Sequence, residues 1–588
     1  FTAIHSMPPR ALLAGTSAVA LLLDSADAPG TRAIIDADTM LAAGWRAPGD
    51  DYPRSLMGSI AHLRQTFLDA QHYRTVWDIY RETDGASRRP GYDFALEALQ
   101  PVLDGALPVV FPATRLDEID RALSLANEFE LRLVIDGGEE ATKATSRLQD
   151  ADVPVLLRID FPAKPRRNTP NLERLEARAR TIGRQVTDAM VQSALGVDRD
   201  TRVTEPAGRF NERLRLWQER VGTPATLATS GLSFAITTRG QHNAGQFLAN
   251  LRLAMEAGLS HDAALRALTV GPAGILGVDR QLGSLEAGKI GNIALLDGRL
   301  GEANTRVRWV VVDGVPYEQA PAAADDPDDD DQPDEPAAET AEAAGDDGVP
   351  VETDASRVPA TRTGGDVLIR NATVLTMAQP GMLEHTDILV RDGLIAQIGR
   401  GLGAPGGTVA VDATDAWVMP GIIDDHSHMA SDGGINEGTL SITAQVRIED
   451  VLHGDDLTLY RAAAGGVTTA NVLHGSANTI GGQRAIIQMK YGVPATELQF
   501  DDYPRGIKFA LGENVTRRRN RFPNTRMGQE AVIRRALTEA QVYQAQWDDY
   551  EAEVRQADRR VAPPRRDLRL ETLAGILSGE ILVHSHGY

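Results

Sequence analysis

The second half of the chain alternates apolar and polar residues in short runs that predict β-strands. Val367–Leu375 and Asp387–Ile398 have this period of two, and an Asp-Gly pair inside the second run indicates a tight turn. The run 409–419 follows as a further strand. A helical pattern over 455–466 ends at a glycine pair and leads into the strand 467–473. This order of strands and helices predicts an α/β domain that begins near residue 366.

Residues 57–80 and 527–550 are two versions of one segment. Ten of the twenty-four positions are identical, and they include three aromatic pairs: Tyr73 and Tyr543, Trp77 and Trp547, and Tyr80 and Tyr550. The Ala, Leu and Arg content suits a long helix in both copies. An internal repeat of this kind predicts that the chain contains parts of two related units.

The apolar strand that begins after Pro420 ends in His426-Ser-His428. Residues i and i+2 of a strand share a face, so both imidazoles can reach one metal ion. Neutral imidazole is a common nitrogen ligand for zinc. Two exposed strand histidines need no metal, so the spacing alone predicts only a candidate metal site.

The stretch Pro420-Gly-Ile-Ile-Asp-Asp-His-Ser-His428 resembles the amidohydrolase superfamily, specifically its imidazolonepropionase-like and prolidase-like branch. The resemblance implies a metal-bearing (β/α)8 TIM barrel whose chain ends form a small composite β-sandwich. It also implies hydrolysis of C–N bonds in amides, cyclic amides or peptides, more rarely of esters. The implied cofactor is one or two divalent metal ions, with zinc the expected metal.

Two further segments match the metal ligands that this resemblance implies. Lys508 lies inside an apolar strand, where an unpaired ammonium is costly to bury; in the family such a lysine is carboxylated and bridges two metals. Glu513 is the alternative carboxylate, and a lysine that extends to the strand end is the alternative without metal. His584 corresponds to the fifth-strand ligand, and His586 is a candidate substrate contact. The family's sixth-strand His and eighth-strand Asp are expected beyond Tyr588, so the catalytic residue is unknown.

The loop 474–483 follows a predicted strand, on the face where TIM barrels place their active sites. His474 and Gln483 are therefore candidate substrate contacts. The glycines between them are equally consistent with a tight loop that has no contact with substrate.

In the first unit, the expected ligand positions carry other residues. Val109-Val110-Phe111-Pro112 stands where the second unit has His584 and His586, and no counterpart of the Lys508 segment is expected between Ala47 and Tyr52. Residues 134–138 contain no histidine, and 234–240 has threonines where the family has Asp. His242 is the nearest ligand-capable histidine. We therefore expect a pseudoenzyme unit kept for packing or binding.

These observations predict two tandem copies of the amidohydrolase α/β TIM-barrel fold, both incomplete. Residues 1–318 are expected to be the C-terminal part of a first, degenerate barrel with its β-sandwich strands. Residues 319–365 are expected to be a linker. Residues 366–588 are expected to be the N-terminal part of a second barrel, with sandwich strands over 366–419 and the barrel from 420.

Charge supports the linker prediction. Positions 325–347 hold twelve acidic residues and no Lys or Arg, so this stretch is expected to be a disordered, solvated spacer, with a docking tail as the alternative. The net charge of −22 argues against a nucleic-acid partner, and the basic run Arg517–Arg526 is assigned no role. The chain contains no cysteine, so a metal must be held by His, carboxylate or modified Lys.

The apolar run 11–23 is too short to span a membrane and is assigned to the first barrel. The chain begins with Phe1, so it is expected to be a fragment, and export or a cytoplasmic location both stay open. The expected partner is a small-molecule or peptide-like substrate, and a homo-oligomer is possible. The alternative function is a non-catalytic tandem-barrel scaffold.

Overall fold

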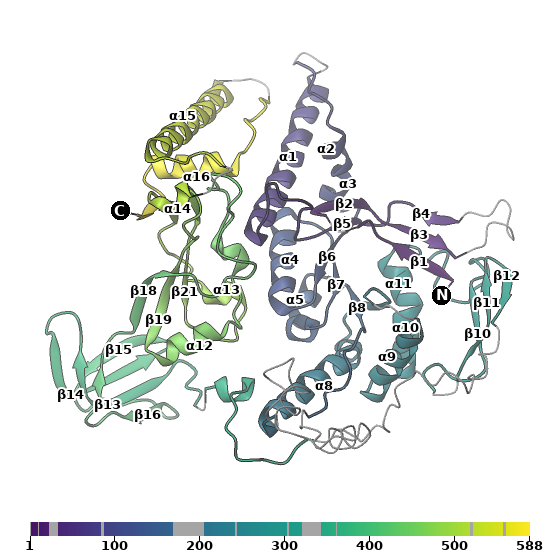
Figure 1. Ribbon diagram of the computed structural model, residues 1–588, viewed down its shortest axis with the longest axis horizontal. Helices are drawn as coiled ribbons and strands as arrows, with labels where there is room; N and C mark the ends of the chain where they lie inside the picture. Colours follow the sequence, from purple (N-terminus) through teal and green to yellow (C-terminus); the bar gives the residue numbers. More distant parts are fainter. Residues whose placement is uncertain are drawn as a thin grey trace, which may run out of the picture.

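The computed structural model describes the chain apart from residues 1, 10, 23–32, 84–87, 168–204, 241–243, 303–304, 320–342, 360, 518–520, 557–559 and 588. His242 and most of the acidic run therefore lie outside the described residues. The described chain forms two α/β units that lie side by side, one coloured purple to teal and the other green to yellow (Figure 1).

The first unit is built on a six-stranded sheet in the order β2-β5-β6-β7-β8-β9. β5 to β9 are parallel, whereas β2 pairs antiparallel with β5 at the edge. Parallel neighbours need crossover connections, which here contain helices, as in a TIM barrel. The strands are β2 (Leu13–Thr16), β5 (Leu41–Ala43), β6 (Val109–Ala113), β7 (Leu133–Gly137), β8 (Val155–Arg158) and β9 (Phe234–Thr237). The helices are α1 (Leu56–Glu82), α2 (Phe94–Ala98), α3 (Gln100–Leu103), α4 (Leu116–Phe129), α5 (Thr145–Asp150), α8 (Ala207–Ser230), α9 (Ala244–Glu256), α10 (His261–Leu268) and α11 (Val270–Ile275).

Both faces of this sheet are buried. Along β6, Val109 and Phe111 face the large core beneath the helices, whereas Val110 faces a second cluster that includes Ala42 and Val134. Alternate residues of a strand point to opposite faces, which explains why β6 is apolar without interruption. The sheet is thus an open part of a barrel.

Two small sheets lie at the edge of the first unit. One contains β1 (Ala3–Ser6), β3 (Ala18–Leu21) and β4 (Ile34–Asp36); the other contains β10 (Ile293–Leu296), β11 (Val307–Val312) and β12 (Val315–Glu318). Val19 and Val312 share a buried cluster. The apolar run 11–23 is thus divided between the main sheet and a small sheet, and no helix in the described part of the chain is long and apolar enough to cross a membrane.

The second unit begins with the predicted sandwich strands. Its first sheet contains β13 (Val367–Leu375), β14 (Met382–Arg391), β15 (Leu394–Gly399), β16 (Val409–Asp412) and β17 (Trp417–Val418). Asp392 and Gly393 join β14 to β15, and both have positive φ, as a tight hairpin turn requires.

The strands that follow form two short sheets. One contains β18 (Ile422–Ser427), β19 (Val467–Val472) and β21 (Ala485–Gln488); the other contains β20 (Ile480–Gln483), β22 (Gly506–Ala510) and β23 (Leu582–His586). β18 and β19 are parallel, as are β22 and β23. The helices are α12 (Leu457–Ala464), α13 (Ala495–Leu498), α14 (Glu513–Thr516), α15 (Arg526–Gln556) and α16 (Leu568–Leu577).

Helices α1 and α15 contain the repeated segment and share its aromatic geometry. The ring centroids of Tyr73 and Trp77 are 6.1 Å apart, and those of Tyr543 and Trp547 are 6.3 Å apart. Trp77 and Tyr80 meet edge to face, and so do Trp547 and Tyr550. The prediction of two long related helices is confirmed.

The N-terminal half of α1 packs on the second unit. Met57 and Ile60 are buried in one cluster with Val446 and Val451. Arg64 pairs with Asp450 at 2.9 Å, and both side chains are less than 10% exposed. The two units therefore share a continuous apolar and ionic contact.

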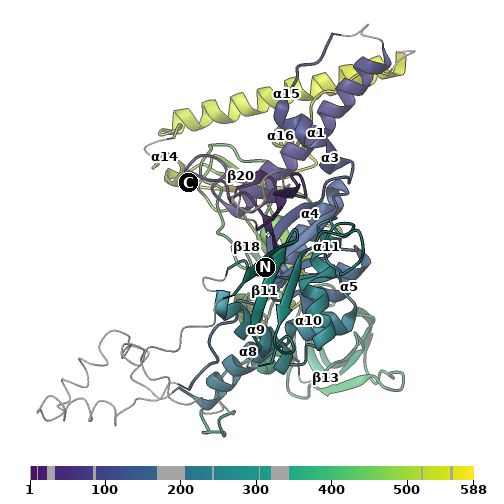
Figure 2. The same cartoon turned by 90° about the vertical axis from the view of Figure 1, so that its right-hand side faces the viewer.

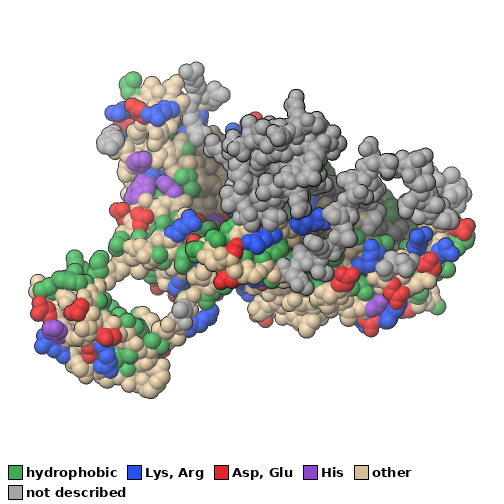
Figure 3. Space-filling model, turned by 60° about the horizontal axis from the view of Figure 1, so that its bottom comes forward, with side chains coloured by type: hydrophobic (Ala, Val, Ile, Leu, Met, Phe, Trp, Pro, Cys, Tyr) green, Lys and Arg blue, Asp and Glu red, His purple; other side chains and the backbone are tan. Residues whose placement is uncertain are grey.

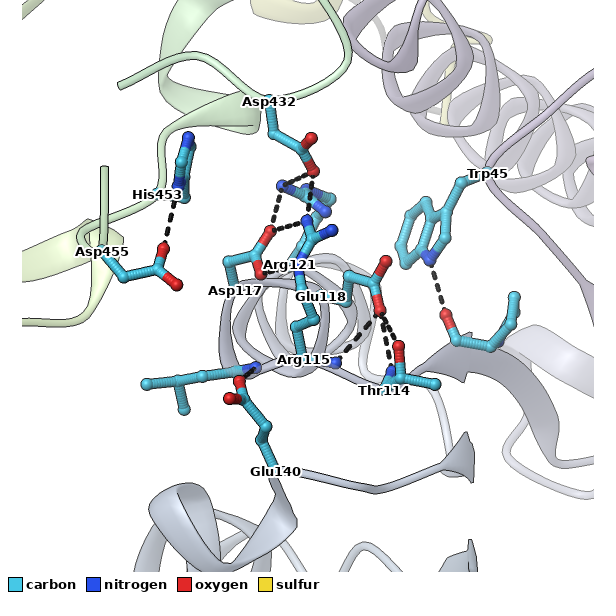
Figure 4. Close-up of polar contacts among 12 residues, drawn as sticks. Trp45, Thr114, Arg115, Asp117, Glu118, Arg121, Glu140, Asp432, His453 and Asp455 are labelled. Carbon is cyan, nitrogen blue, oxygen red and sulfur yellow. Dashed lines mark hydrogen bonds and ion pairs between the residues drawn. The ribbon is translucent and has the colours of Figure 1, made fainter. Parts of the chain in front are cut away.

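A second group of charges crosses the same boundary at the start of α4. Arg115 and Arg121 of the first unit converge on Asp117 and on Asp432 of the second unit (Figure 4). The Arg115 to Asp432 distance is 2.7 Å.

The described end of the predicted linker, residues 343–359, lies against α8. Asp347 accepts a hydrogen bond from the backbone N–H of Ala207, the first residue of α8. The side-chain amide of Asn211 donates to the carbonyl of Ala344 and accepts from its backbone N–H. Arg357 reaches the Tyr491 hydroxyl of the second unit. Residues 343–359 therefore differ from the expected solvated spacer. Their acidic and polar groups form hydrogen bonds with the N-terminal end of α8, where backbone N–H groups lack partners within the helix. Figure 2 shows α8 from a second side.

Candidate metal centre

The histidines at the ends of β18 and β23 lie together, as the sequence predicts. The ring centroid of His426 is 5.3 Å from that of His428, 5.2 Å from that of His584 and 5.6 Å from that of His586. Figure 3 shows a group of histidine side chains on this face of the molecule. In the sequence, 154 residues separate the end of β18 from the start of β23. The fold brings the four imidazoles of these two segments to one place.

Lys508 joins this group from β22. Its Nζ lies 3.1 Å from Nε2 of His426, and in the parallel register it stands directly beside His584. The side chain is 1% exposed, and burial lowers its pKa to about 8. A large fraction of its amines is therefore neutral at mildly alkaline pH, the form that can react with CO₂.

The imidazoles are kept in the form that binds metal. Burial lowers the pKa of His426 and of His584, and the charge of Lys508 lowers both further. His428 contacts the carbonyl of Leu473 through Nδ1 at 2.7 Å. Since a carbonyl only accepts, Nδ1 carries the proton and Nε2 keeps its lone pair.

His474 does not belong to this group. It is fully buried, its Nδ1 contacts the carbonyl of Gly475 at 2.8 Å, and its Nε2 accepts from the backbone N–H of Glu437 at 2.9 Å. Burial lowers its pKa to about 4. Both ring nitrogens are used within the protein, which favours the alternative that this loop has no contact with substrate. A Cβ on Gly481 would lie 2.7 Å from the His474 ring. This close approach supports the alternative that the loop glycines are needed for a tight loop.

Gln483 and Glu513 also lie elsewhere. The Gln483 amide donates to the carbonyl of Ala444 and to the Thr572 hydroxyl, and its oxygen accepts from Arg505. Glu513 is exposed and pairs with Arg517 at 2.6 Å. The structure thus places neither side chain in contact with the histidine group, and Gln483 is hydrogen-bonded within the protein.

The side chains of this group are of the types that bind a divalent metal ion. Their arrangement in the structure does not form a complete metal-binding site. His426, His428 and His584 supply neutral nitrogen, and Lys508 would supply oxygen once carboxylated. Among the described residues, no three His, Asp or Glu side chains are arranged to hold an ion. The amine of Lys508 contacts the His426 nitrogen that a metal would need.

Sequence reasoning missed the residues that hold this group in place. Ser476 hydrogen-bonds to Nδ1 of His586, and the Leu473 carbonyl orients His428. Glu437 holds His474 from a loop 37 residues earlier. No sequence motif marks these residues, because each acts through the fold.

The strand register identifies the first-unit residues that occupy the ligand positions. Lys508 pairs with His584, whereas Ala42 pairs with Val110 in the equivalent strands β5 and β6. In the alignment that the repeat predicts, Ala42 takes the position of Lys508. Neither Ala42 nor Val110 can bind a metal.

Comparisons with known proteins identify relatives of parts of the chain. The Amidohydrolase family matches residues 211–328, which begin in α8 of the first unit and end within the predicted linker. Amidohydrolase tasK of Hapsidospora irregularis is 31% identical over 264 residues, which cover 38% of this chain and 27% of that protein. A dihydroorotase of Pelobacter propionicus is 43% identical over 68 residues, which cover 12% of this chain and 16% of that protein. The chain thus spans about a quarter or less of these relatives.

Among solved structures, an amidohydrolase of Thermotoga maritima matches 54% of this chain and 72% of its own, with a TM-score of 0.40 and 20% identity. The family and sequence matches show that parts of the chain are similar to amidohydrolases.

Proposed function

We propose that the protein is a metal-dependent hydrolase that cleaves C–N bonds of amide, cyclic amide or peptide substrates at the second unit. The observation that carries this proposal is the convergence of His426, His428, His584 and Lys508 from the three strands β18, β22 and β23. The amidohydrolase matches support C–N hydrolysis, and the relatives named dihydroorotase and D-hydantoinase favour a small substrate.

The described residues would each have a defined part in this reaction. His426, His428 and His584 would hold a divalent metal, zinc or a similar ion, through neutral nitrogen. When bound, such an ion supplies hydroxide near neutral pH and polarises a carbonyl. Lys508 would add oxygen ligands after its neutral amine attacks CO₂, forms an N–C bond and releases a proton. His586, which is exposed beside His426, is placed to contact substrate.

The first unit would then be a pseudoenzyme that supports the second. Ala42 and Val110, which pair in β5 and β6, would occupy two of its ligand positions, and α1 packs against the second unit. We propose on this basis that the chain carries two tandem amidohydrolase units, only the second of which binds metal.

Metal analysis tests the proposal. After reconstitution with zinc, the protein should retain about one or two ions per chain, as one mononuclear or binuclear site holds. The double variant His426→Ala/His428→Ala should lose this metal and any amide hydrolysis, because two nitrogen donors are removed. His385→Ala, which changes an exposed histidine on β14, is the matched control and should keep both. Asp136→Asn in the first unit should also leave metal content unchanged.

The second candidate is a non-catalytic scaffold, favoured by the absence of a finished metal cage among the described residues. The two functions separate in the same experiment. A protein that takes up no metal, or a double variant that keeps all of it, would refute the hydrolase assignment to the second unit.

A further inference from the structure

The first unit contains a cavity at the carboxyl ends of its parallel strands. Its volume is about 340 Å³, and it is lined by the ends of β5, β6, β7 and β8 and by the residue run 7–9. This end of a parallel α/β sheet is where ligands bind in folds of this type. The cavity thus occupies the place of an active site in a unit that lacks metal ligands.

Arginine provides an excess of positive charge in this cavity. Arg46, Arg158 and Arg239 line it, together with the carboxylates of Asp136 and Glu118. One oxygen of Asp136 accepts from both Arg158 at 2.6 Å and Arg239 at 2.8 Å. A guanidinium has five N–H donors, so most donors of Arg158 and Arg239 form no hydrogen bond with Asp136.

Glu118 is bound to the start of α4. Its carboxylate accepts from the backbone N–H and the hydroxyl of Thr114, both at 2.8 Å, and from the N–H of Arg115 (Figure 4). It is therefore the capping residue of α4. Asp136 is the carboxylate that pairs with both inner arginines.

The rest of the wall is apolar. Met7, Pro8, Ala14 and Val110 line it, and Trp45 is held by a hydrogen bond to the carbonyl of Pro112 and by stacking on Phe111 at 4.6 Å. An apolar wall with a few convergent polar groups is typical of a small-molecule site. Inorganic anions would leave this wall uncovered.

We propose that this cavity binds a small organic carboxylate, whose carboxyl group pairs with Arg158 and Arg239 and whose apolar body lies against Met7, Ala14 and Val110. Planar guanidinium groups form two parallel hydrogen bonds with carboxylate, which selects it over neutral amides. The first unit has thus exchanged metal ligands for a cationic binding site.

The test uses valerate and its neutral counterpart valeramide as probes, with binding to the full chain measured by calorimetry. Valerate should bind at one site per chain and valeramide at least about tenfold more weakly, because the charged hydrogen bonds are lost. Arg239→Gln should weaken valerate binding by a similar factor. Arg147→Gln is the matched control: Arg147 is equally exposed, at 33% against 32%, and also pairs with an aspartate.

A second variant guards against misfolding. Ala14→Leu adds volume inside the cavity and keeps all charges, so it should also abolish valerate binding. His426→Ala/His428→Ala should leave it intact, which separates this site from the proposed metal centre. Equal binding of valeramide, no binding of valerate, or full binding by both Arg239→Gln and Ala14→Leu would overturn the proposal.

Discussion

Glu437 of the second unit caps the first helix of the first unit through Ser55. One oxygen of the Glu437 carboxylate lies 2.9 Å from both the backbone nitrogen and the hydroxyl of Ser55, and 2.9 Å from the backbone nitrogen of Arg54. The carboxylate is fully buried. Because the backbone of Glu437 also holds His474, this residue links α1 to the loop beside the candidate metal centre.

Glu437→Gln should destabilise the contact between the units. The amide keeps the shape of the side chain, but one of its ends can only donate, and it faces groups that also donate. Leaving buried donors unpaired costs on the order of 1–3 kcal/mol. Denaturant unfolding measures the change. Glu530→Gln, at an exposed ion pair on α15, is the control and should change stability little. Equal stability of both variants would show that the Glu437 contact is weak.

The same carboxylate should make stability depend on pH. Burial by itself raises the pKa of Glu437, but hydrogen bonds from Thr439, Ser55 and Arg54 together outweigh it and lower the pKa. A carboxyl whose pKa is lower in the folded state stabilises the fold above its ordinary pKa of about 4.3. That contribution is lost as pH falls through the folded pKa.

The comparison with Glu437→Gln isolates this effect. The free energy of unfolding should differ between the parent and the variant at pH 7, and the difference should shrink as pH falls toward 3. Protonated Glu and neutral Gln then resemble each other in charge. A difference that stays constant over this range would contradict a lowered pKa at Glu437.

Gly58 in the first turn of α1 leaves room for the Glu437 carboxylate. A Cβ at this position would lie 2.9 Å from the carboxyl carbon of Glu437 and 3.0 Å from Cβ of Pro53. Gly58→Ala should therefore destabilise the protein, although Ala normally stabilises a helix relative to Gly by about 1 kcal/mol. Gly222→Ala in α8, where a Cβ meets no atom within 4 Å, should show that ordinary gain. A gain at both positions would argue against the close contact of Gly58 and Glu437.

Local patterns predicted those parts of the fold that local chemistry determines. The hairpin at Asp392 and Gly393 followed from its turn residues, and the His426 and His584 strands followed from apolar runs that end in histidine. The helices α1 and α15 followed from the repeat. In each case the residues that fix the element are close together in sequence.

Contacts between distant segments escaped prediction. The sequence leaves open whether His474 contacts substrate, because its burial and its hydrogen bond with Glu437 depend on the packed loop. The match of Ala42 to Lys508 depends on strand register, which the short β5 does not reveal in sequence. The acidic stretch at Asp347 looked free of partners because the start of α8 that it caps is 140 residues away.

Lys508→Met should remove the side chain that would supply oxygen ligands to the candidate metal centre once carboxylated. It should also stabilise the protein at pH 7. Burial lowers the pKa of Lys508 to about 8, below the ordinary value of about 10.4. Between these values the unfolded chain binds more protons than the folded one, so the stability of the parent rises with pH across this window. At pH 7 the parent bears the full cost of a buried ammonium, which methionine avoids with similar volume.

The variant should thus unfold at a higher denaturant concentration at pH 7, lack the rise in stability between about pH 8 and 10, and retain less zinc. Lys490→Met, at an exposed position, should match the parent in all three measurements. If Lys508→Met kept the parent's metal content, Lys508 would not be a ligand, and if it also lost stability at pH 7, its ammonium would have a partner in the fold.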